Sequence, residues 1–306
     1  MGRAFAIALN TLREAIRDKV LYAVTAFATA VLLGTRVLAE LSLDQQERVV
    51  RDIGIAAISL FGVLVALFLG SSLLYKEIER KTLYVVLPKP IHRWEFLVGK
   101  FAGIVLTGQI FLALIGGVFL LLVGQQAGGD LSVLLLGLLA GLVALVVLVR
   151  KAPDPTFVVA PWAFALLAAS SLYAMQAGEP IGAHLRALVL IGGEVSVLTA
   201  VALFFSSFST PFLTGTLSAG IWLVGRSADS LQTVQSRMLP DELKSLMRGI
   251  AEVVPNFNLF VPGSNVIGEA ATAPWAYVGT SLLYALCYTA VLLILASLIF
   301  RRRDLA

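Results

Sequence analysis

Eight long apolar stretches run through this chain of 306 residues, and they constrain its fold more than any other feature. A helix needs about 20 apolar residues to cross the hydrocarbon core of a bilayer. Composition agrees, because 58% of the residues are hydrophobic and only 14% are charged, against about 25% charged in a soluble domain. We therefore predict eight membrane-spanning segments, at about 20–39, 53–74, 101–123, 131–149, 157–176, 187–205, 208–225 and 276–300.

These segments predict an all-α polytopic membrane protein, because backbone groups in lipid must be hydrogen-bonded within the segment. No stretch alternates as a barrel strand does. The sixth and seventh segments run together, with Glu194 as the only charged residue in either. A single helix through both would be about twice as long as the bilayer core is thick. We therefore predict a turn at 206–210, ahead of Pro211; a re-entrant hairpin over 208–225 is the alternative.

Basic residues predict the orientation. One side of an eight-span chain collects fifteen Lys and Arg, and the other side eight. The richer side faces the cytoplasm under the positive-inside rule, which places both termini there. Within a transmembrane domain of 20–300, a cytoplasmic loop at 75–100 and an extracytoplasmic segment at 226–275 are expected. Residues 1–19 are expected to form a cytoplasmic interfacial helix, and residues 301–306 a basic cytoplasmic tail.

Motifs for catalysis and nucleotide binding are absent from the sequence. It contains no G-x-x-x-x-G-K-[ST], H-E-x-x-H or G-x-S-x-G string. One cysteine and two histidines leave little for a metal site. We therefore predict that the chain is not itself an enzyme and holds no cofactor or metal. The basic residues are scattered between apolar runs, which argues against a nucleic-acid partner.

The loop at 75–100 concentrates the charge, with nine charged residues of both signs in 26 residues. It is far longer than a helix hairpin requires. Its length and charge favour a docking surface, although a solvated loop that only enforces topology fits the composition equally well. Glu77 is expected to extend the preceding helix, and Arg93 to start the next one.

Three strings in and after this loop form a pattern. They are Glu77-Ile78-Glu79-Arg80-Lys81-Thr82-Leu83, Leu87-Pro88-Lys89-Pro90-Ile91-His92-Arg93 and Gly99-Lys100-Phe101-Ala102-Gly103. They resemble the first cytoplasmic loop of ABC-2 type transporter permeases, the membrane subunits of one class of ABC transporters. That family's usual pattern is E-x-E-x-G-T-L, P-I-x-R and then G-K, and Lys81 here replaces a common glycine. Family members usually have six spans, so 131–176 is interpreted as an extra pair.

The resemblance implies a permease that moves a substrate, by export, with ATP hydrolysed by a separate ATPase subunit docked on the 75–100 loop. ATP and magnesium would bind in that partner. Two ATPase copies and a second permease copy or homologue would complete the transporter in lipid, in a bacterial cytoplasmic membrane. The implied contact residues are Glu77, Glu79, Arg80, Lys81, Thr82, Lys89, Pro90, His92, Arg93 and Glu95.

Few polar residues are available for a transport pathway. Glu194 is an intramembrane carboxylate and hence a functional candidate; a structural carboxylate that hydrogen-bonds another helix or reaches the outer interface is the alternative. Ser59, Thr214 and Ser218 are polar positions within other spans, and hydroxyls there also commonly satisfy backbone groups. A mostly apolar pathway favours an amphipathic or lipid-like cargo.

Three other functions stay open at this point. A non-transporting subunit that anchors or regulates a complex fits the same spans. An energy-independent channel or secondary transporter should show internal repeats and several midplane charges, and neither is found. A membrane-embedded enzyme is disfavoured, since no set of His, Asp, Glu or Cys converges within the spans.

Overall fold

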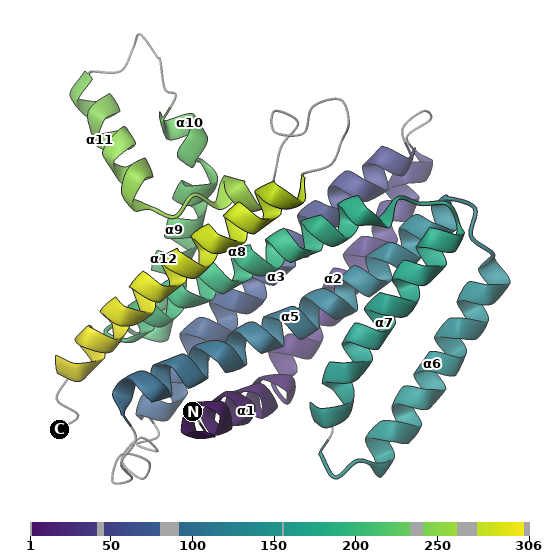
Figure 1. Ribbon diagram of the computed structural model, residues 1–306, viewed down its shortest axis with the longest axis horizontal. Coiled ribbons are helices and arrows are strands. Elements are labelled where there is room, and N and C mark those ends of the chain that lie inside the picture. Colours follow the sequence, from purple (N-terminus) through teal and green to yellow (C-terminus); the bar gives the residue numbers. More distant parts are fainter. Residues whose placement is uncertain are drawn as a thin grey trace. The chain divides into compact units, whose positions relative to one another are not determined.

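A computed structural model describes residues 2–41, 46–79, 92–154, 156–232, 241–261 and 274–302. These residues are almost entirely helical, as Figure 1 shows. The predicted all-α architecture is therefore confirmed for the described part of the chain. The elements are α1 (Gly2–Ile16), α2 (Lys19–Glu40), α3 (Gln46–Glu79), α5 (Arg93–Gln126), α6 (Leu131–Lys151), α7 (Thr156–Gln176), α8 (Ile181–Ser206), α9 (Pro211–Arg226), α10 (Ala228–Gln232), α11 (Asp241–Val253), the 3₁₀ turn η1 (Phe257–Phe260) and α12 (Trp275–Arg302).

Aspartate side chains fix the start of helices that follow short connections. Asp18 accepts a hydrogen bond from the backbone N–H of Val20 at 3.0 Å, at the start of α2. Asp130 does the same for the N–H of Ser132 at 2.8 Å, at the start of α6. These amides have no partner inside the helix, so the cap stabilises its first turn. Hydrogen bonds from the Ser132 hydroxyl and amide hold the pKa of Asp130 below its ordinary value.

Seven described helices are long and apolar enough to cross a membrane, namely α2, α3, α5, α6, α7, α8 and α12. The remaining predicted span, 208–225, corresponds to α9, which has 16 residues. A helix of that length measures about 24 Å, less than the roughly 30 Å hydrocarbon core. Eight membrane-spanning helices were predicted, and the described ranges contain seven that are long enough. Whether α9 crosses the membrane completely stays a prediction.

The predicted turn between the sixth and seventh segments is confirmed. Helix α8 ends at Ser206 and α9 begins at Pro211. Thr210, just before the proline, has extended backbone angles (φ −79°, ψ 162°), because a following proline disfavours the helical conformation. The Ser209 hydroxyl donates to the Phe205 carbonyl at 2.8 Å, so it satisfies one of the acceptors left free where α8 stops.

The contacts divide the chain into two compact units. Unit 1 contains residues 1–11, 66–105 and 189–306, and unit 2 contains residues 12–65 and 106–188. Helices α1, α3, α5 and α8 each contribute residues to both.

In unit 1, the core lies along α8, whose apolar side chains from Leu190 to Leu203 are largely buried. Helix α3 approaches this core at Gly70, where an added Cβ would lie 2.5 Å from the Ala202 Cβ. Only glycine permits so close an approach of two helices.

Tyrosines of α12 fix the segment that follows α11 in unit 1. The Tyr288 hydroxyl donates to the Val253 carbonyl at 2.6 Å, and the Tyr277 hydroxyl donates to the Leu259 carbonyl at 2.9 Å. Val253 is the last residue of α11, and Leu259 lies in η1. The described part of the predicted extracytoplasmic segment is therefore an ordered helical region held against α12.

In unit 2, α6 and α7 lie side by side, as Figure 1 shows. Helix α7 packs closely on α5, since a Cβ at Gly124 would lie 2.8 Å from the Ala174 Cα. Helix α6 differs, because none of its residues is buried. A helix that is apolar all round and exposed on its own chain is suited to contact with lipid.

The connection between α6 and α7 carries a paired carboxylate. Asp154 accepts a hydrogen bond from the Thr156 backbone N–H at 3.0 Å, and its carboxylate lies 2.6 Å from Nε of Arg13 and 3.9 Å from the Arg17 guanidinium. The Thr156 amide, helped by the Arg13 charge, holds the pKa of Asp154 below its ordinary value. This carboxylate therefore joins the end of α1 to the start of α7.

We expect Asp154→Asn to lower the thermal unfolding midpoint at pH 7 and to have no effect at strongly acid pH. Asparagine still caps the helix but loses the charge that Arg13 binds. Since the folded-state pKa lies below the ordinary value of 3.8, the stabilisation is complete at neutral pH and disappears as the pH falls through the folded-state value. Unfolding curves of the solubilised protein at pH 7, 5 and 3 measure this. Asp52→Asn, in an exposed pair with Arg48, is the control, and an equal loss at pH 7 and pH 3 would contradict the prediction.

Candidate functional site

The candidate site is the charged connection between α3 and α5. Of its ten predicted contact residues, Glu77 and Glu79 belong to the last turns of α3, as the expected extension of that helix requires. His92, Arg93 and Glu95 lie at the start of α5, where a helix beginning at Arg93 was predicted and is confirmed. The other five lie outside the described residues: Arg80, Lys81, Thr82, Lys89 and Pro90.

Glu95 caps the start of α5. Its carboxylate accepts a hydrogen bond from the backbone N–H of His92 at 3.1 Å. This is one of the two hydrogen bonds of a capping box, in which an acidic side chain in the first turn accepts from the backbone N–H of the residue before the helix. A carboxylate at this end also interacts favourably with the helix dipole. Two of the predicted contact residues therefore define where the loop ends and the helix begins.

Arg93 ties the start of α5 to the end of α12. Its guanidinium donates to the Phe300 carbonyl at 2.7 Å and lies 5.9 Å from the centre of the Phe300 ring. The ring of Phe96, one turn further along α5, stacks on Phe300 with centroids 6.2 Å apart. An arginine at a helix C-terminus satisfies a free carbonyl and balances the negative end of the dipole. The two helix ends are thus joined by polar and aromatic contacts together.

The glycines that follow the loop bring α1 against α5. A Cβ at Gly99 would lie 2.7 Å from the Ala4 carbonyl oxygen, and one at Gly103 would lie 2.6 Å from the Ala8 carbonyl oxygen. Gly99 and Gly103 are four residues apart, so they occupy the same face of α5. Small residues at this spacing allow two helix backbones to approach closely. The G-x-x-x-G part of the quoted string is therefore the surface on which α1 packs.

Lys100, between the two glycines, is 1% exposed. Its ammonium lies 6.0 Å from the centre of the Phe96 ring, within reach of a cation–π interaction. The basic residue of the G-K pair is thus buried inside the cluster formed by α1, the start of α5 and the end of α12. The sequence placed Lys100 in the charged loop and in the G-K string, and its burial was not predicted.

The four predicted pathway residues are all buried, with Ser59 in unit 2 and Glu194, Thr214 and Ser218 in unit 1. The Thr214 hydroxyl shares a hydrogen bond with the Ser209 hydroxyl at 2.7 Å, which ties α9 to the preceding turn. Their role in a pathway stays a prediction.

Glu194 is fully buried and has partners on α9. Its carboxylate accepts a hydrogen bond from Trp222 Nε1 at 2.9 Å and lies 3.5 Å from the Arg226 guanidinium. Arg226 also lies over the Trp222 ring, 5.7 Å from its centre, and donates to the Phe257 carbonyl at 3.3 Å. The carboxylate is therefore bonded to protein groups of another helix, which is the arrangement that the structural alternative describes.

Unit 2 contains a second ionic cluster, which was not predicted from the sequence. The Glu179 carboxylate lies 2.7 Å from the Arg51 guanidinium and 3.0 Å from Nε2 of His184. The Phe119 ring packs edge-on against the His184 ring at 5.4 Å. The only available sequence signal was a carboxylate in an otherwise uncharged connection before α8. Across the described ranges no group of three or more His, Cys, Asp and Glu residues is arranged to hold a metal ion.

Seven membrane-length helices in the described ranges, together with a charged connection whose end packs among α1, α5 and α12, define a multi-pass membrane protein. The family model for the ABC-2 family transporter protein matches residues 5–305. The chain therefore belongs to the ABC-2 transporter family, and it is a permease, a membrane transport component of that family. A comparison with curated proteins finds no match.

Proposed function

We propose that the chain exports its substrate using ATP hydrolysed by a separate ATPase subunit that docks on the 75–100 loop. ATP and magnesium bind in that partner, and this chain holds neither. Two ATPase copies and a second permease copy or homologue complete the transporter, in a bacterial cytoplasmic membrane. The sequence has no phosphate-binding glycine motif, which supports ATP binding in a separate subunit.

The observation that carries this proposal is the way the start of α5 is anchored. Arg93 holds the Phe300 carbonyl of α12 at 2.7 Å, and Gly103 places α5 in backbone contact with α1. A partner that displaces residues 92–95 therefore moves three helices together. Packed elements of this kind transmit a local displacement because they do not deform continuously. A loop that only enforced topology would need no such anchorage.

The cargo we propose is amphipathic or lipid-like. Polar side chains within the membrane-length helices are few, and Glu194 is bonded to Trp222 rather than open. A pathway with so few free charges favours molecules that carry their own apolar surface.

The proposal is tested by reconstituting the chain in nanodiscs with a candidate ABC ATPase from neighbouring genes and measuring ATP hydrolysis. We expect the ATPase to bind, and its rate to respond to the permease and then to lipid-like or amphipathic cargo in proteoliposomes. Permease binding without any cargo response would support a non-transporting subunit instead. ATP hydrolysis by the isolated chain would contradict the proposal outright.

Charge reversal in the loop should uncouple the two subunits. We expect Glu79→Lys or Arg80→Glu to lower permease-stimulated ATP hydrolysis about tenfold, since a mispaired interface charge costs roughly 1.4 kcal/mol or more. Unfolding midpoints should match the wild type, because the change affects docking only. Arg248→Glu, an exposed position on α11, is the matched control. Stimulation that survives both loop reversals would contradict docking at this loop.

A further inference from the structure

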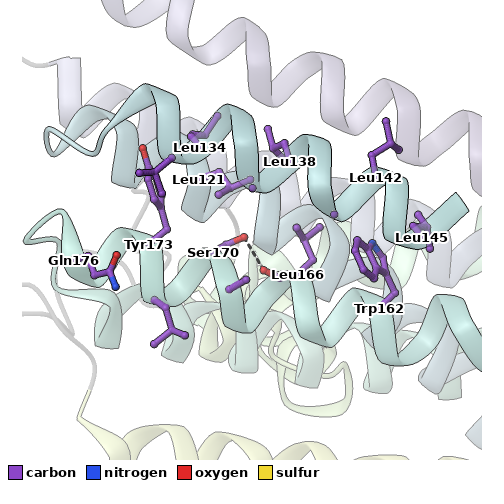
Figure 2. Close-up of a pocket in the computed structure, with 15 residues that line it drawn as sticks. Leu121, Leu134, Leu138, Leu142, Leu145, Trp162, Leu166, Ser170, Tyr173 and Gln176 are labelled. Atoms are coloured by element: carbon purple, nitrogen blue, oxygen red, sulfur yellow. Dashed lines mark hydrogen bonds between the residues drawn. The ribbon is translucent and has the colours of Figure 1, made fainter. Parts of the chain in front are cut away.

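An apolar groove lies between α6 and α7 in unit 2. Its volume is about 450 Å³, within the roughly 300–1,000 Å³ range of ligand sites. Figure 2 shows leucines of α6 facing Trp162, Leu166 and Tyr173 of α7 across it. At the middle of α6, a Cβ at Gly137 would meet no atom within 4 Å, so the absence of a side chain there leaves room between the helices, whereas a Cβ at Gly141 would lie 3.3 Å from the Trp162 ring. The groove is therefore an apolar slot that follows the two helices, and its lining suits a hydrocarbon chain.

The two ends of this groove differ in charge. At one end, the Tyr173 hydroxyl donates to the Asp130 carbonyl at 3.3 Å, so the connection before α6 borders the groove there. At the other end, Leu145 and Trp162 are the last lining residues. Arg150 lies five residues beyond Leu145 and Lys151 follows it, and both are exposed. Two cations therefore lie beyond one end of the slot, outside its lining, and none of the lining residues is charged.

Nothing in the short α6–α7 connection cancels these two cations. Its one carboxylate, Asp154, is already engaged by Arg13 at 2.6 Å. Arg17, 3.9 Å from the same carboxylate, has a side chain that is 67% exposed. Glu14 and Asp18 stand beside these two arginines, so the end of α1 carries both signs of charge. Within the described residues, the two unpaired cations of the hairpin end are therefore those of α6.

We propose that this groove is a binding site for an anionic phospholipid. One acyl chain lies in the slot between α6 and α7, and the phosphate contacts Arg150 and Lys151. An apolar slot with exposed cations on the helix end beyond it matches a molecule with an apolar chain and a long, flexible anionic head. Basic residues at the end of a membrane helix each favour anionic lipid. A helix from a second copy would leave the asymmetry of charge unexplained, and it is an outcome of the test.

Photolabelling tests the site without reference to transport or to any ATPase. The chain is placed in phosphatidylcholine nanodiscs with a trace of diazirine-tailed phosphatidylglycerol or diazirine-tailed phosphatidylcholine, and labelled residues are mapped by mass spectrometry. We expect phosphatidylglycerol to label groove residues roughly tenfold more than phosphatidylcholine, from two headgroup contacts. Equal labelling by the two lipids would overturn the proposal.

Two sets of variants test the contacts of the lipid headgroup and of its acyl chain separately. Arg150→Gln with Lys151→Gln should abolish the preference for phosphatidylglycerol, whereas Lys244→Gln with Arg248→Gln on α11 should keep it. Gly137→Leu should lower labelling by both lipids several-fold, because a Cβ there meets no atom within 4 Å and the side chain can fill the slot.

Ala140→Leu, on the same helix and outside the lining, is the control for Gly137→Leu. Unfolding midpoints close to the wild type establish that each variant is folded. A preference for phosphatidylglycerol that persists in the Arg150 and Lys151 variant overturns the proposal. So does a high-yield disulfide between two copies carrying Leu138→Cys, which would place a second protein helix in the groove.

Discussion

Replacing Gly103 by leucine is expected to separate α1 from α5 and to destabilise the protein by roughly 3 kcal/mol, the upper end for overpacking. Even a Cβ at this position would lie 2.6 Å from both the Ala8 carbonyl oxygen and the Thr11 Cβ. The carbonyl belongs to the backbone of a helix, so it cannot move aside as a flexible side chain does. Thr11 is fully buried, which leaves no space on the other side.

Two measurements check this prediction. The unfolding midpoint should fall sharply, and a cysteine introduced at Thr11 should become reactive to a water-soluble maleimide in the Gly103→Leu background. Gly34→Leu in α2 is the matched control, because a Cβ at Gly34 meets no atom within 4 Å. If the two leucine variants unfold alike, α1 does not pack on this glycine.

The same substitution also bears on the proposed coupling. If α1 moves with α5, its detachment should lower permease-stimulated ATP hydrolysis at temperatures where Gly103→Leu remains folded. The smaller Gly103→Ala should give an intermediate loss. An ATPase response equal to the wild type in a folded Gly103→Leu protein would mean that α1 takes no part in transmission.

Local features of the fold were predictable from the sequence because their causes are local. The break before Pro211 follows from the length that lipid allows and from the restriction that proline places on its predecessor. The start of α5 at Arg93 was predictable because two prolines precede it in the sequence and a proline disfavours the helical conformation in the residue before it. The seventh predicted span, 208–225, was the harder case. Hydropathy marks an apolar run over 208–225, but the helix within it ends after 16 residues.

The contacts of the candidate site could not be predicted, because they join residues distant in sequence. Arg93 and Phe300 are separated by 207 positions, and Arg51 and Glu179 by 128. Such pairs depend on how each helix is rotated about its axis, which apolar periodicity does not fix when a helix is apolar on every side. Gly99 and Gly103 were identified in the sequence only as members of the 99–103 motif. Their role as the surface on which α1 packs became visible only in the structure.

The largest effect in unit 1 is expected at the Glu194 and Arg226 pair, and it should be asymmetric. Arg226→Leu leaves a fully buried carboxylate without its cation, and breaking a buried pair in this way costs about 3–5 kcal/mol. Glu194→Leu should cost less, because the Arg226 side chain is 26% exposed and also donates to the Phe257 carbonyl. Chemical unfolding in detergent gives both values.

A double variant distinguishes structural pairing from a role in transport. If the pair is structural, Glu194→Leu with Arg226→Leu should recover most of the stability that Arg226→Leu loses, because the buried carboxylate is then gone together with its cation. Glu194→Gln should cost little, since its amide oxygen can still accept from Trp222. A double variant as unstable as Arg226→Leu alone would contradict the pairing. A stable double variant that binds its ATPase and moves no cargo would instead assign Glu194 to the pathway, because the fold would then have no further need of its charge.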